Sequence, residues 1–118
     1  MAEHASEEIV VEASPEACWA VLIDVEKYPS WVPDLKSVEV LERDDEGRGL
    51  VVEFRAAGFG RSTTYSLRYD YDEPRRLGWQ LESGDVERAI DGAYILEGDG
   101  ESTRVTYELS IELKVPIP

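Results

Sequence analysis

Side chains that could act as nucleophiles or bind metal ions are scarce in this sequence. It contains one cysteine, Cys18, and one histidine, His4. Cys18 falls on the apolar stripe of a predicted helix, which favours a small buried side chain over a reactive thiolate. His4 precedes every predicted core element, so neither a Ser-His-acid triad nor a histidine-based metal site can be assembled. We therefore expect no metal ion and no cofactor, and we assign no catalytic residue.

The acidic residues do not form a matched pair of general acid and base. Glu7 and Glu8, like Asp44 and Asp45, lie beside turns or outside the predicted core, where carboxylates are solvated. Asp91 follows the outward phase of its strand. Because no acid or arginine is predicted to point inward, only tyrosine hydroxyls remain as candidate proton donors, and binding is favoured over catalysis.

A glycine-rich segment from Gly58 to Ser62 has a superficial likeness to a phosphate-binding loop. It lacks the G-x-G-x-x-G spacing and is not followed by a helical pattern. We interpret it as a hairpin turn or bulge between two strands, with Phe59 at the rim of a cavity.

Aromatic side chains are the strongest candidates for a binding site. They fall on the inward phase of several different strands, where core packing is the ordinary role, but their number favours a surface that binds a flat apolar ligand with one or two polar groups. The residues predicted to line this site are Phe54, Tyr65, Tyr69, Trp79, Tyr94, Tyr107 and Leu109.

These residues must be positioned by a sheet, because most of the chain alternates between apolar and polar residues. Regular turns separate about seven strands, the first from Glu7 to Ala13 and the last from Thr103 to Val115, which indicates an antiparallel meander. Ser14 and Pro15 begin a predicted helix that runs to Val25. Trp19 and the later Trp31 are expected to anchor the helix and its following turn against the sheet. This helix is too short to cover seven strands alone.

Composition restricts the class of protein. With 118 residues and a net charge of −14, the chain fits one domain, and its charge repels nucleic acid and anionic membrane surfaces. No apolar run approaches the roughly 20 residues of a membrane span, and the polar, acidic N-terminus differs from a signal peptide. We expect a cytoplasmic protein that binds no nucleic acid and does not insert into membranes.

The order of these elements resembles the polyketide cyclase/dehydrase and lipid-transport superfamily, also called START-like, SRPBCC or Bet v 1-like. The resemblance rests on Pro15, Trp19, Asp24, Tyr28, Pro29, Trp31 and Pro33, on the segment from Asp72 to Trp79, on Asp91 and Gly92, and on the segment from Thr103 to Tyr107. It implies an α+β helix-grip fold, in which a curved antiparallel sheet of about seven strands with short N-terminal helices curls around a long C-terminal helix and encloses an apolar cavity.

The resemblance implies three functions. The first is binding or transport of a small hydrophobic ligand, such as a polyketide, quinone or lipid, in the cavity. The alternatives are an aromatase/cyclase or dehydratase, and an accessory factor acting through a protein partner.

The sequence departs from the family in one respect, because it stops after the last strand, where the family continues into the C-terminal helix. We therefore expect residues 1–118 to be one START-like domain truncated at its C-terminus. The uncovered apolar face would make such a chain marginally stable, dimeric or aggregation-prone, and a protein partner or a second copy of the chain is expected to cover the face if the helix is missing.

Overall fold

The computed structural model describes residues 2–58, 61–98 and 100–114. Two short helical segments, α1 (Pro15–Leu22) and the 3₁₀ helix η1 (Val25–Ser30), follow the first strand, and strands make up the rest. The strands are β1 (Ala2–Val11), β2 (Leu35–Arg43), β3 (Gly49–Gly58), β4 (Arg61–Asp72), β5 (Arg76–Gly84), β6 (Glu87–Gly98) and β7 (Thr103–Leu113). The α+β class predicted from the sequence is confirmed.

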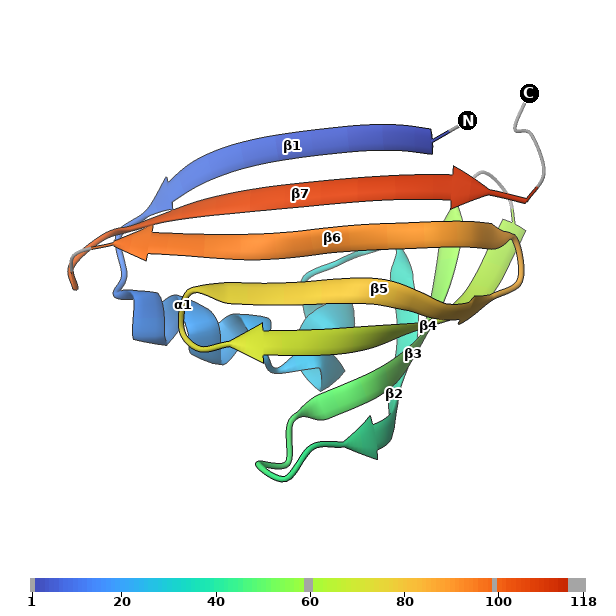
Figure 1. The fold of residues 1–118 in the computed structure, drawn as a ribbon, viewed down its shortest axis with the longest axis horizontal. Coiled ribbons are helices and arrows are strands. Elements are labelled where there is room, and N and C mark those ends of the chain that lie inside the picture. Colours follow the sequence, from blue (N-terminus) through green and yellow to red (C-terminus); the bar gives the residue numbers. More distant parts are fainter. Residues whose placement is uncertain (1, 59–60, 99, 115–118) are drawn as a thin grey trace.

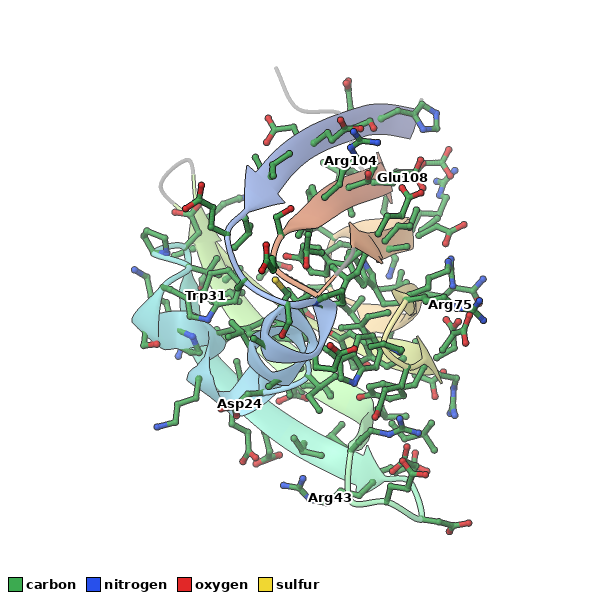
Figure 2. The ribbon with its side chains drawn as sticks, turned by 90° about the vertical axis from the view of Figure 1, so that its left-hand side faces the viewer. Asp24, Trp31, Arg43, Arg75, Arg104 and Glu108 are labelled. Carbon is green, nitrogen blue, oxygen red and sulfur yellow. The ribbon has the colours of Figure 1, made fainter. Side chains whose placement is uncertain are left out.

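All seven strands belong to one antiparallel sheet. Their order is β1-β7-β6-β5-β4-β3-β2, so strands that are consecutive in sequence from β2 to β7 are also adjacent in the sheet. β1 pairs with β7 and forms one edge of the sheet, and β2 forms the other. The sheet bends strongly between the upper strands and the β2–β3 hairpin, and α1 and η1 lie on its concave side (Figure 1). Seen from one end, the strands curl around the helical segment (Figure 2).

The first strand is longer than the sequence suggested. We expected it to run from Glu7 to Ala13, but β1 spans Ala2–Val11 and pairs with β7 along its whole length. His4 is therefore not in a tail before the core, because it lies in β1 opposite Ser110. The polar residues of this segment concealed the strand, since an edge strand with exposed faces shows no apolar alternation.

The first helix begins where it was predicted and ends earlier. The Ser14 hydroxyl accepts a hydrogen bond from the Ala17 N–H at 3.1 Å, and Pro15 occupies the first helical turn. The predicted extension to Val25 is wrong: α1 ends at Leu22, and η1, which contains Pro29, carries the chain toward β2.

The core forms between these helical segments and the concave face of the sheet. Trp19, Leu22, Val25 and Tyr28 supply the helical side, and the sheet supplies Val52, Phe54, Leu67, Tyr69, Leu77, Trp79, Ile90 and Leu96. The prediction that Trp19 anchors the helix is confirmed. Trp31 differs, because 46% of it is exposed, so it is not a buried anchor. It projects at the left of Figure 2.

The hairpin predicted at the glycine-rich segment is present, since β3 and β4 are antiparallel and their last described pair is Gly58 with Arg61. Phe59, which we placed at the cavity rim, lies outside the described residues, as does the predicted strand end at Val115.

Candidate functional site

A pocket of about 300 Å³ opens on the concave face of the sheet. All seven residues predicted to line a binding site lie on its wall: Phe54, Tyr65, Tyr69, Trp79, Tyr94, Tyr107 and Leu109. They come from β3, β4, β5, β6 and β7. Further lining residues come from η1, from the segment after it and from the start of β2, namely Tyr28, Val32, Asp34 and Leu35. The structure thus brings the predicted residues together, and their binding of a ligand stays a prediction.

The aromatic rings of the pocket form two groups, and the rings within each group contact one another. Trp79, Tyr94 and Tyr107 lie together, with centroid separations of 5.2 Å for Trp79–Tyr94 and 5.1 Å for Tyr94–Tyr107. Phe54 stacks with Tyr65 at 5.7 Å. These contacts hold the rings in fixed orientations, which suits the pocket to a flat apolar molecule.

Gly92 sets the position of the Trp79 indole. A Cβ atom at residue 92 would lie 2.6 Å from three atoms of the indole ring, so only glycine leaves room for the ring to lie against β6. The space beside Gly92 is occupied by Trp79, which forms part of the pocket wall.

The tyrosines divide into two kinds by what their hydroxyls contact. Tyr28 donates to the Leu22 carbonyl, and Tyr71 donates to the Gly49 carbonyl at 2.5 Å, so both fasten one backbone segment to another. The hydroxyls of the second kind make no hydrogen bond to any residue that the structure describes. These tyrosines are Tyr65, Tyr69, Tyr94 and Tyr107. Their hydroxyls are available to a bound molecule.

Burial moves the pKa values of these phenols further above neutral pH. It raises the pKa of Tyr94 to about 12, with the Tyr107 hydroxyl adding to the effect. It also raises the pKa of Tyr65 to about 12, with a further contribution from the Glu87 carboxylate, and that of Tyr69 well above its ordinary value. Near neutral pH the pocket therefore presents hydrogen-bond donors and no phenolate.

Glu87 is a pocket residue that sequence reasoning missed. It lines the pocket and is only 6% exposed, whereas we had predicted no inward acid. The cause is a register shift: Glu87 pairs with Leu113 and Ala89 with Glu112, so Arg88 is an extra residue in β6. This bulge reverses the alternation, and Glu87 shares the inward side with Ile90 although the two are three residues apart. Asp91 is exposed, as predicted.

Two donors from the protein hold the Glu87 carboxylate. The Thr63 hydroxyl on β4 lies 3.0 Å from Oε2 and 3.2 Å from Oε1, and the Val86 N–H donates to Oε1 at 3.2 Å. Gly84 leaves space for the side chain, because a Cβ there would lie 2.7 Å from Oε1. No lysine or arginine among the described residues forms an ion pair with Glu87.

Other possible sites offer less. Among residues 2–58, 61–98 and 100–114, no group of three or more His, Cys, Asp or Glu side chains could hold a metal ion. A second, more open depression on the convex face includes His4, Arg76, Asp91 and Glu108. None of the helices in the described ranges is long and apolar enough to cross a bilayer.

Comparison with known proteins places the chain in a family context. Residues 11–118 match the family model described as polyketide cyclase / dehydrase and lipid transport. A START superfamily protein from Mycobacterium smegmatis has 26% sequence identity and a TM-score of 0.88, with 98% of this chain and 80% of that chain covered. An aromatase/cyclase from Streptomyces sp. R1128 has 23% identity and a TM-score of 0.85, covering 98% and 71% of the two chains. The second likeness supports the fold alone.

Proposed function

The chain belongs to the polyketide cyclase/dehydrase and lipid-transport family, and from this premise we propose that its concave pocket binds one small, flat, predominantly apolar ligand, such as a polyketide, quinone or lipid-like molecule. The observation that carries the proposal is the set of four tyrosines whose hydroxyls have no partner among the described residues and which line one aromatic pocket. Among the described residues, the buried side-chain atoms without a hydrogen-bond partner include the Trp19 indole nitrogen and none of these hydroxyls, so the hydroxyls open onto the pocket, where a ligand can reach them.

The dimensions of the pocket support a ligand of modest size. A volume of about 300 Å³ lies at the lower end of the range for small-molecule sites. Most of the lining is aliphatic or aromatic, which provides hydrophobic binding energy, while the phenols provide orientation. Tyr28 and Tyr71 supply an internal comparison, because tyrosines that stabilise the fold use their hydroxyls on backbone carbonyls.

A polyketide aromatase/cyclase or dehydratase is the second candidate, and Glu87 favours it. Acid–base chemistry on a bound chain needs a proton acceptor and a donor in reach of the same ligand. The buried Glu87 carboxylate and the protonated Tyr65 phenol both line the pocket. The absence of an inward acid, which led us to favour binding over catalysis, therefore no longer counts against an enzyme.

A fluorescent probe tests the pocket. The neutral dye N-phenyl-1-naphthylamine should bind with one site per chain, and Tyr94→Ala should weaken its affinity by roughly tenfold, because truncation removes an aromatic contact worth about 1 kcal/mol or more. Fluorescence titration measures both quantities. Tyr94 is only half-buried, so the variant should keep its fold.

Tyr28→Phe is the matched control. It removes the hydroxyl that bonds the Leu22 carbonyl, so it should lower the melting temperature and leave probe affinity nearly unchanged. A folded Tyr94→Ala protein that binds the probe as tightly as the wild type would refute the assignment of this pocket.

A further inference from the structure

The buried end of the pocket contains a carboxylate whose hydrogen-bonding capacity is only partly used. An ionised carboxylate offers about four acceptor positions. Glu87 receives hydrogen bonds from two donors among the described residues, the Thr63 hydroxyl and the Val86 N–H. A carboxylate that is 6% exposed and forms no ion pair with a described residue is costly to bury unless further donors reach it, and the Lys114 ammonium on the neighbouring turn binds the Gly84 carbonyl instead.

The surrounding chain fixes the position of this carboxylate. The turn between β5 and β6 is held on the β4 side, where the Asp85 N–H donates to the Thr64 carbonyl at 3.0 Å. On the β7 side, the Lys114 N–H donates to the Val86 carbonyl at 2.7 Å, and the Lys114 ammonium donates to the Gly84 carbonyl at 2.9 Å. The bulge at Arg88 and the small residue Gly84 then direct Glu87 inward. A group held this firmly can fix the orientation of a ligand.

We propose that the Glu87 carboxylate accepts a hydrogen bond from a hydroxyl group of the bound ligand, so that the pocket selects flat apolar molecules carrying a hydroxyl at one end. This inference rests on the proposed function. The rings of Trp79, Tyr94 and Tyr107 bind the apolar body, and Glu87, with Tyr65 beside it, binds the polar end.

The neighbours of Glu87 favour a hydroxyl over an ammonium group. A hydroxyl needs one acceptor, whereas an ammonium brings three N–H donors that must all be satisfied. The lining residues at this end of β6 and β7 are Ile90, Ile111 and Leu113, whose side chains offer no acceptor. Apart from Glu87 itself, the nearest acceptor among the lining residues is the Tyr65 hydroxyl, while the Asp34 carboxylate, which also lines the pocket, is exposed and hydrated.

Competition between two ligands of the same shape tests the proposal. The probes are 2-naphthol and 2-methylnaphthalene, each displacing N-phenyl-1-naphthylamine at neutral pH, and the quantity measured is the ratio of their affinities. Glu87→Gln keeps the shape of the side chain and removes its charge. The preference for 2-naphthol over 2-methylnaphthalene should fall roughly tenfold in this variant, because a hydrogen bond to a charged acceptor is stronger than one to a neutral amide by about that factor in affinity.

Glu108→Gln is the matched control, since Glu108 is an exposed carboxylate on β7 that lies outside this pocket. It changes the net charge equally and should leave the ratio unchanged. If Glu87→Gln fails to fold, Glu87→Asp, which keeps the charge and shortens the reach, should lower the ratio in its place.

The outcomes separate this inference from the function on which it rests. If neither naphthalene nor the dye binds the wild type, the proposed function fails. If the dye and both naphthalenes bind, and the affinity ratio is the same in the wild type, Glu87→Gln and Glu87→Asp, the pocket is a ligand site but Glu87 does not bind the ligand hydroxyl. Tighter binding of the cationic 2-naphthylmethylamine than of 2-naphthol would overturn the assignment of a hydroxyl.

Discussion

Replacing Trp19 with alanine is expected to lower the free energy of unfolding by about 3 to 5 kcal/mol, the range for removing a buried aromatic side chain. Trp19 is 4% exposed and belongs to the core, with its ring 6.2 Å from that of Tyr71. Its indole N–H has no hydrogen-bond partner among the described residues, so we expect the loss to come from packing. Urea denaturation followed by circular dichroism measures the change.

Trp31→Ala is the matched control for this prediction. Trp31 is 46% exposed, and its ring contacts that of Tyr28 at a centroid distance of 5.1 Å. Its removal should cost about 1 kcal/mol, the worth of one aromatic pair plus limited burial. Equal losses for the two variants would show that the turn after η1 packs more tightly in solution than the structure indicates.

Alkaline pH is expected to destabilise the protein strongly. The pKa values of Tyr65, Tyr71 and Tyr94 are raised from 10.0 to about 12, in each case chiefly by burial, and those of Tyr28 and Tyr69 are also raised. A group with a raised pKa in the folded state contributes stability that is complete below pH 10 and is lost as the pH rises through about 12. Between these values the unfolded chain ionises its tyrosines and the folded chain does not.

The loss should reach several kcal/mol in total, on the order of 1 kcal/mol per pH unit for Tyr65 and less for the more exposed Tyr94 and Tyr71. Denaturation at a series of pH values, with tyrosinate absorbance recorded in parallel, measures it. Tyr65→Phe should reduce the pH dependence of the free energy of unfolding by the contribution of Tyr65. Tyrosinate formation near pH 10 in a protein that stays folded would contradict the burial of these phenols.

The sequence predicted the fold well because its signals were local and consistent. Alternation in segments such as Thr103 to Leu113 requires a half-buried strand, and Ser14 followed by Pro15 marks a helix start. The errors fall where tertiary context decides. The residues of β1 before Glu7 are polar and become a strand only because β7 offers a partner. Trp31 and Trp19 look equivalent in sequence, yet only Trp19 faces the sheet.

The aromatic wall of the candidate site could also be predicted, since Phe54, Tyr65, Trp79 and Tyr94 obey the alternation of their strands. Glu87 could not, because one extra residue in β6 reverses the inward phase and nothing in the local sequence marks that bulge. A prediction from simple alternation therefore misses Glu87, the buried carboxylate among the described pocket residues.

Native mass spectrometry of the purified chain tests the central claim most directly, because it counts bound molecules. With N-phenyl-1-naphthylamine in excess, the pocket predicts one dye per chain, displaced by 2-naphthol in a ratio of one to one. Tyr94→Ala should lose most of this complex at the same dye concentration, while Tyr28→Phe should retain it. A folded wild-type chain that binds no dye, or binds a distribution of several that Tyr94→Ala leaves unchanged, would contradict the claim that this pocket is a ligand site.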